Sequence, residues 1–67
     1  MNASDRVRHN IIKIRKEKGY TQERLAYESD MSKGHLSEIE SGRKSPTVRT
    51  LEKIAETLEV PLSKLTF

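Results

Sequence analysis

The absence of cysteine from a chain of 67 residues is the feature that most limits how it can fold. A domain this small hides only about 60% of the surface that its unfolded chain exposes, so its stability is marginal. Small scaffolds usually gain the missing stability from disulfides, a structural metal or a partner subunit. Without cysteine, disulfides and thiolate zinc sites are excluded, which fits a reducing compartment. Efficient helix packing, reinforced by dimerisation, is the remaining source of stability.

Hydropathy and composition limit the compartments in which the protein is expected and the folds that it can adopt. No apolar run approaches the roughly 18 residues that a membrane span requires, and the N-terminal region lacks the apolar stretch of a signal peptide. Glycine and proline are few, whereas Lys, Glu, Arg, Leu and Ile are abundant, which favours helices. We therefore expect a single cytoplasmic domain over residues 1–67. Its formal net charge of +3 suggests an anionic partner.

The first predicted helix covers about residues 4–18. Its apolar stripe follows the i, i+4, i+7 spacing of an amphipathic helix through Val7, Ile11 and Ile14. Ser4 is expected to cap the start of this helix. Gly19 stands just past its end, where a left-handed conformation suits glycine.

Two short helices are predicted next, over about residues 21–41. Thr21 and Ser32 are their expected N-caps. Asp30 breaks the pattern between them, and aspartate tolerates the positive φ of a tight turn. Small Ala26 lets the second helix of the pair cross the first at a steep angle, as in a helix-turn-helix. The residues expected to face inward are Leu25, Ala26, Ser29, Met31, Leu36 and Ile39.

The last part of the chain predicts one longer helix and one short helix. Gly42 ends the third helix, residues 43–46 form a loop, and Thr47 is expected to cap the fourth helix. The inward positions of this helix match the helical template and are Val48, Leu51, Ile54, Ala55 and Leu58. Pro61 suits the first turn of a fifth helix that ends near Thr66. No stretch alternates as a strand does, so the expected fold class is all-α with five helices.

Positive charge is concentrated in two blocks of the sequence. Residues 1–18 hold six Lys/Arg and two acids, and residues 33–49 hold four Lys/Arg and two Glu. The intervening and final segments are acidic. A single exposed lysine usually does no more than solvate the surface, but this clustering indicates an anion-binding surface that includes the third helix and its loop.

Motifs around the two short helices occur in an order that is hard to obtain by chance. They are Tyr20-Thr21-Gln22-Glu23, Leu25-Ala26, Met31-Ser32, Leu36-Ser37-Glu38-Ile39-Glu40-Ser41-Gly42, Ser45-Pro46-Thr47 and Thr50-Leu51-Glu52-Lys53-Ile54-Ala55. Over about residues 8–65 the chain resembles the phage-repressor-like, Xre-type helix-turn-helix family. The resemblance implies a compact five-helix, lambda-repressor-like domain whose second and third helices form the helix-turn-helix. It also implies a transcriptional regulator, of repressor or controller type, that binds double-stranded operator DNA as a homodimer and associates with the nucleoid.

The start of the third helix departs from the family pattern. It reads Lys33-Gly34-His35 instead of the frequent Gln, Thr or Arg, which leaves the target sequence open, and Asp30 replaces the common turn glycine. A cation at the positive end of a helix is unfavourable by a few tenths of a kcal/mol. A glycine in a helix interior costs up to about 1 kcal/mol. Two locally unfavourable residues side by side indicate a functional surface. Lys33 is therefore predicted to donate to guanine and Gly34 to let the helix backbone approach the duplex, and a frayed, exposed helix start is the alternative.

Further contacts are expected one turn along the third helix. Glu38 is predicted to accept a hydrogen bond from cytosine N4 or to repel phosphates in wrong registers, and a solvated glutamate is the alternative. Ser37 is predicted to donate to a base or phosphate, or to act as a small spacer. His35 is predicted to reach a phosphate, with an exposed histidine as the alternative.

Contacts to the DNA backbone are expected on both sides of the third helix. Gln22 begins the second helix, where its side chain and the free amides can hold a phosphate. The resemblance implies that this glutamine also supports the third helix. Arg43 and Lys44 are predicted to clamp the backbone without reading sequence. Ser32 is also predicted to contact the DNA backbone and so to help position the protein.

Other conspicuous side chains are assigned to structure. The resemblance places Arg15 and Glu40 opposite each other, as an ion pair that links the first helix to the third. Tyr20 and Tyr27 are predicted to pack in the fold rather than to stack on single-stranded bases. Apolar residues near the C-terminus are expected to form a homodimer seam, and they are Val60, Leu62, Leu65 and Phe67.

Two other classes of function compete with DNA binding. An enzyme is not expected, because His9 and His35 lie in no catalytic or metal-binding motif. No cofactor, metal, membrane or small-molecule ligand is predicted. The stronger alternative is an antitoxin or coactivator-like module that uses the same fold to bind a protein.

Overall fold

The computed structural model describes residues 2–67, and Met1, part of the expected domain, lies outside the described residues. Those residues form five helices and no strand: α1 (Ala3–Glu17), α2 (Gln22–Glu28), α3 (Lys33–Glu40), α4 (Val48–Leu58) and α5 (Ser63–Thr66). The all-α prediction is confirmed. None of these helices is long and apolar enough to cross a membrane.

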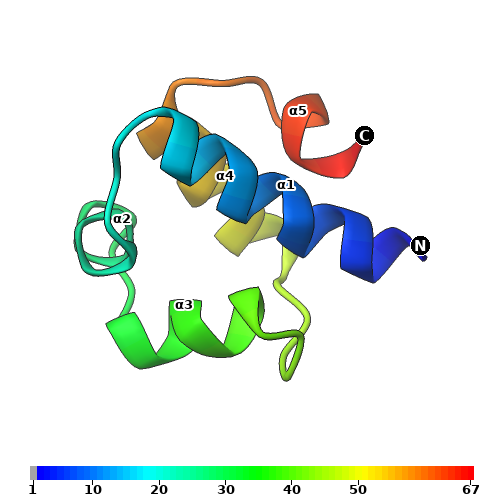
Figure 1. The fold of residues 1–67 in the computed structure, drawn as a ribbon, viewed down its shortest axis with the longest axis horizontal. Helices are drawn as coiled ribbons and strands as arrows, with labels where there is room; N and C mark the ends of the chain where they lie inside the picture. Colours follow the sequence, from blue (N-terminus) through cyan, green and yellow to red (C-terminus); the bar gives the residue numbers. More distant parts are fainter. Residues whose placement is uncertain (1) are drawn as a thin grey trace.

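The helices surround one apolar core to which each of them contributes. In Figure 1, α1 crosses in front of α4, α5 lies above them, and α3 runs along the lower edge next to α2. The buried apolar residues are Ile11, Leu25, Ala26, Leu36, Ile39, Leu51, Ile54, Ala55, Leu58 and Leu65. The inward positions predicted for the second and third helices are therefore confirmed, with Ser29 also buried and Met31 packed against the core.

Side-chain caps begin the first four helices. Thr21 Oγ1 accepts from the Arg24 amide at 3.0 Å, and Ser32 Oγ accepts from the His35 amide at 3.0 Å. Thr47 caps α4 in the same way, with its Oγ1 3.1 Å from the Thr50 nitrogen. The predicted cap of α1 was wrong, because Asn2 rather than Ser4 accepts from the Asp5 amide, at 2.8 Å. Serine and asparagine are equally good caps, so their preferences do not distinguish neighbouring candidates.

The turn between α2 and α3 has the predicted left-handed residue. Asp30 adopts φ 57°. The chain then returns to α2, because the Met31 amide donates to the Ala26 carbonyl at 3.0 Å. Ala26 itself is 1% exposed, so its methyl group lies at the close contact between the two helices. This turn fixes the direction in which α3 leaves α2.

The first residue of α4 does not face the core as predicted. Val48 is 65% exposed, although it continues the spacing of Leu51 and Leu58. Side chains of a helix lean toward its N-terminus, so a residue in the first turn projects beyond the helix rather than onto its neighbours. Periodicity alone does not show where the surface beneath a helix ends.

The C-terminal helix packs back on α1. Leu65 is fully buried, and the carbonyl of the same residue accepts a hydrogen bond from Asn10 Nδ2 at 3.0 Å. The prediction that Leu65 belongs to a dimer seam was therefore wrong. Pro61 was expected in the first turn of the fifth helix but precedes its N-cap, Leu62, and its carbonyl accepts from the Lys64 amide.

Candidate nucleic-acid interface

The outer face of α3 carries the predicted base-reading residues. Lys33, Gly34 and Ser37 are exposed, and Glu38 is half-exposed. Leu36 and Ile39 of the same helix are buried, which orients the opposite face of α3 toward solvent. The structure thus brings the predicted base-reading residues together on the outer face of α3. This helix runs along the lower edge of the molecule in Figure 1.

Nothing within the fold requires glycine at position 34. Its φ is not positive, and a Cβ built there would meet only Ser32 Oγ, at 4.0 Å. A glycine near a helix start lowers helix stability relative to alanine, so the residue is locally unfavourable and unsupported by packing. The outer surface of α3 at Gly34 is open space, free for a molecule outside the protein.

A buried ion pair holds α3 to α1. Arg15 Nε lies 2.8 Å from Glu40 Oε2 and Arg15 Nη2 lies 3.0 Å from Glu40 Oε1, so the contact is bidentate. The side chains of Arg15 and Glu40 are only 11% and 6% exposed. The predicted pair is present in the structure. Arg15 Nη1 also donates to the Tyr20 carbonyl at 3.0 Å, which fixes the chain between α1 and α2.

Gln22 joins this network from the start of α2. Its Nε2 donates to Glu40 Oε1 at 3.0 Å, so the side chain connects α2 to α3. A carboxamide nitrogen has two hydrogens, and one of them is engaged here. The other hydrogen and the helix-start amides are the groups with which Gln22 can contact a phosphate.

Arg8 contributes a link to α3 that was not predicted. Its Nη1 lies 3.5 Å from the Glu40 carbonyl, and its Nε bonds Asp5 at 3.2 Å. A cation near the C-terminal end of a helix interacts favourably with the helix dipole. The signal was present in the spacing, since Arg8 and Arg15 lie seven residues apart and therefore on the same face of α1.

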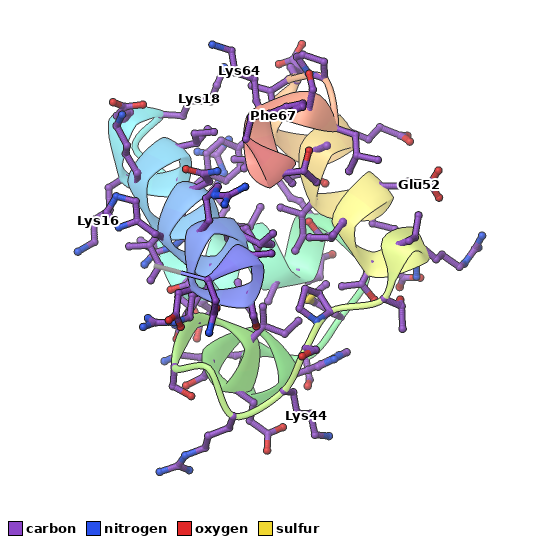
Figure 2. The ribbon with its side chains drawn as sticks, turned by 90° about the vertical axis from the view of Figure 1, so that its right-hand side faces the viewer. Lys16, Lys18, Lys44, Glu52, Lys64 and Phe67 are labelled. Atoms are coloured by element: carbon purple, nitrogen blue, oxygen red, sulfur yellow. The ribbon has the colours of Figure 1, made fainter. Side chains whose placement is uncertain are left out.

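The loop after α3 places two cations beside the outer face of this helix. Arg43 and Lys44 are both exposed, and Figure 2 shows Lys44 projecting at the lower end, next to α3. Lys44 Nζ lies 3.5 Å from Glu38 Oε1. His35 is half-buried on α3, and Ser32 uses its hydroxyl oxygen as the cap described above. Of the predicted phosphate-contacting residues, Ser32 precedes α3, His35 lies on it, and Arg43 and Lys44 follow it.

The positive charge of α1 lies largely elsewhere. Arg8 and Arg15 are engaged within the fold, and Lys16 and Lys18 project away from α3 in Figure 2. Arg24 of α2 bonds Glu28 at 2.8 Å and lies over the Tyr20 ring. The hydrogen bond to Glu28 raises the pKa of Arg24. The positive charge of the candidate interface therefore comes from the second basic block, residues 33–49.

The two tyrosines have different environments. Tyr20 packs against the core as predicted. Tyr27 is 84% exposed, so its predicted packing role was wrong. Because Leu25, Ala26 and Ser29 occupy the inner face of α2, the residue at position 27 faces solvent.

Comparison with known proteins identifies close sequence relatives. A family model described as "Helix-turn-helix" matches residues 11–65. The transcriptional regulator SlrR of Bacillus subtilis is 50% identical in an alignment of 57 residues that covers 82% of this chain and 38% of that protein. The regulator y4dJ of Sinorhizobium fredii is 45% identical over 76% of this chain and 66% of its own length. The immunity repressor of Bacillus phage phi105 is 37% identical, over 88% of this chain and 41% of the repressor. The chain thus spans less than two thirds of these relatives.

Solved structures show the same arrangement of helices. A point mutant of the restriction-modification controller protein C.Esp1396I has a TM-score of 0.89 and 38% identity, covering 97% of this chain and 84% of that one. The controller protein C.AhdI of Aeromonas hydrophila has a TM-score of 0.88 over 92% and 94% of the two chains. Its 22% identity supports a likeness of fold alone.

Proposed function

This chain belongs to the Xre-type helix-turn-helix family, and we propose that it is a transcriptional regulator that binds double-stranded operator DNA as a homodimer. The observation that carries the proposal is the outer face of α3. This face is polar, free of internal packing and next to the exposed cations Arg43 and Lys44. The relatives are themselves named transcriptional regulators and repressors, which supports this assignment.

The dimensions and side chains of α3 suit the major groove. With its side chains an α-helix is about 10–12 Å across, and the major groove of B-DNA, about 12 Å wide, admits it. The eight residues of α3 make a helix about 12 Å long. In the groove, Lys33 donates to guanine O6 and N7, Glu38 accepts from cytosine N4, and Ser37 contacts a base or phosphate. Gly34 allows the backbone of α3 to approach the bases.

Phosphate contacts orient α3 in this proposal. Ser32 and His35 lie at the start of α3, the loop cations Arg43 and Lys44 follow its end, and Gln22 contacts Glu40 from α2. Such contacts supply affinity and register but no base preference. The Arg15–Glu40–Gln22 network holds α3 at a fixed angle, so that its side chains meet the bases in one register.

The dimer seam that we propose is smaller than the predicted one. Phe67 is 87% exposed, whereas Val60 and Leu62 pack partly against the core and Leu65 is buried in it. Phe67 lies at the end of the molecule opposite Lys44 in Figure 2, well away from the proposed DNA surface. Two copies of α3 would enter successive major grooves, with half-sites about 34 Å apart.

Selection of bound sequences from random duplexes tests this function. The expected result is a palindromic consensus whose half-sites are one helical turn apart. Absence of any enriched sequence, together with recovery of a specific protein partner that contacts the C-terminal surface, would support the antitoxin-like or coactivator-like alternative instead.

Gly34→Ala is expected to change stability and DNA affinity in opposite directions. Alanine stabilises a helix interior by up to about 1 kcal/mol relative to glycine, and less in the first turn. The added methyl group meets only Ser32 Oγ within the protein but would project toward the bases. Denaturant unfolding measures the first effect and titration with the selected operator the second. Equal or tighter operator binding would contradict the proposed close approach at Gly34.

Arg43→Ala is expected to weaken binding to all duplexes by the same factor. Arg43 is exposed and makes no ion pair within residues 2–67, so its charge is free for a phosphate. Loss of one phosphate contact lowers the magnitude of the slope of log K against log salt by about 0.9. Salt titrations of an operator and an unrelated duplex measure this change. An unchanged slope would remove Arg43 from the proposed interface.

A further inference from the structure

The two cations of the loop after α3 have different environments. Lys44 Nζ lies 3.5 Å from the Glu38 carboxylate. Arg43, its neighbour in sequence, has no acidic partner in the described part of the chain. Both side chains carry the same charge and both are exposed. The difference between them is therefore the contact with a residue of the recognition surface.

The backbone brings Lys44 back to α3. Gly42 adopts a left-handed φ of 84° just after the helix. The chain consequently folds over the last turn of α3, and the amides of Arg43 and Lys44 donate to the Glu38 carbonyl at 2.9 and 3.2 Å. Ser41 Oγ donates to the same carbonyl at 3.1 Å. The position of Lys44 beside Glu38 thus depends on the backbone and not only on a side-chain rotamer.

A lone carboxylate on a DNA-facing surface is repelled by phosphates. Lys44 offsets this charge and restricts the direction of the Glu38 side chain. An ionised carboxylate has about four lone-pair sites on two oxygens, so it can accept from a lysine and from a base amino group together. Lys44 lies nearest Oε1, which leaves Oε2 of Glu38 for cytosine N4.

We propose that Lys44 is a positioning residue for base reading, holding Glu38 in the orientation that selects cytosine. The inference rests on the proposed DNA-binding function and deepens it, because it assigns specificity to a cation that was predicted to contact only phosphates. Arg43 remains the clamp that carries no base preference.

The contact between Lys44 and Glu38 is expected to matter in the DNA complex rather than in the free protein. The side chains of Lys44 and Glu38 are 59% and 42% exposed, and such surface pairs contribute little to folding. When DNA excludes water from the surface, the attraction between Lys44 and Glu38 strengthens. Replacement of Lys44 should therefore change base preference without changing the unfolding transition.

Binding by Lys44→Gln, Arg43→Gln and Glu38→Gln tests the proposal. The wild-type operator is first selected, and each protein is then titrated with duplexes that carry all four bases at each operator position. We expect Glu38→Gln to reduce a cytosine preference of roughly five- to 150-fold at one position of each half-site, because a carboxamide oxygen is uncharged and its NH2 group favours adenine. Lys44→Gln should reduce the same preference, whereas Arg43→Gln should lower affinity equally for every base.

The double variant Glu38→Gln/Lys44→Gln separates coupling from independent contacts. Its base preference should match that of Glu38→Gln alone, because Lys44 acts on preference through Glu38. If Lys44→Gln leaves the cytosine preference intact, or changes it equally in the Glu38→Gln background, the proposal is wrong. Specific operator binding with no position sensitive to Glu38 would overturn this proposal alone. Failure of the wild-type protein to bind any duplex would overturn the proposed function as well.

Discussion

Replacing Glu40 with alanine is expected to remove about 3–5 kcal/mol of folding stability, the loss that follows when one partner of a buried ion pair is deleted. The remaining Arg15 guanidinium would be buried without its carboxylate, and Gln22 would lose its acceptor. A folded domain of 67 residues has a total stability of about 3–10 kcal/mol. Denaturant unfolding should therefore show a Glu40→Ala protein that is close to unfolded or fully so.

A double variant distinguishes an uncompensated charge from lost packing. Arg15→Met/Glu40→Leu replaces the pair with apolar side chains of similar size, which is often neutral or stabilising. We expect the double variant to be more stable than Glu40→Ala or Arg15→Ala. A loss below about 1 kcal/mol in Glu40→Ala, the range of surface pairs, would contradict the role assigned to this network.

Replacing Phe67 with aspartate is expected to dissociate the proposed dimer. Full burial of a phenylalanine contributes about 1.5–3 kcal/mol, and a twofold-symmetric seam buries two copies. The dissociation constant should therefore rise by about 10²- to 10⁴-fold, with weaker operator binding as a consequence. Sedimentation measures the change in assembly. The monomer itself should unfold as before, because Phe67 is 87% exposed within it.

Tyr27→Asp is the matched control for this variant. Tyr27 is another exposed aromatic residue, but it lies on the outer face of α2 and outside the proposed seam. The Tyr27→Asp protein should sediment as the wild type does. A wild-type protein that is monomeric at every concentration tested, or a Phe67→Asp protein that still forms the dimer, would remove Phe67 from the seam.

Local signals in the sequence predicted most of the fold. Thr21, Ser32 and Thr47 cap their helices because capping depends on the residue and the amides two or three positions on. Asp30 was predictable for a similar reason, since its left-handed conformation is a property of the turn. Helical spacing then identified most of the residues through which the first four helices enter the core.

Two of the wrong predictions, for Val48 and Leu65, concern tertiary packing. The exposure of Val48 and the burial of Leu65 depend on what lies beneath each residue, and helical spacing does not contain that information. A short apolar C-terminal segment is equally consistent with a core contact and with a dimer seam. Only the return of α5 onto α1, with Asn10 bonded to the Leu65 carbonyl, distinguishes the two.

The sequence predicted which residues make up the candidate site, but it predicted fewer of the contacts between them. The order of motifs identified α3 and its flanking residues, and the family resemblance placed Arg15 opposite Glu40. The contact between Lys44 and Glu38 depends on how the chain folds back after Gly42, and Arg8 reaches α3 across 32 residues of sequence. Such contacts arise from the packed fold rather than from spacing within one helix.

The central claim is that the outer face of α3 reads base identity. Parallel duplex selections with the wild-type protein and Lys33→Ala test it most directly, because Lys33 is exposed at the start of α3 and lies outside the buried core. The account predicts two consensus sequences that differ at one base pair of each half-site, where the variant loses its preference for guanine. Identical consensus sequences, or no enrichment with either protein, would contradict it.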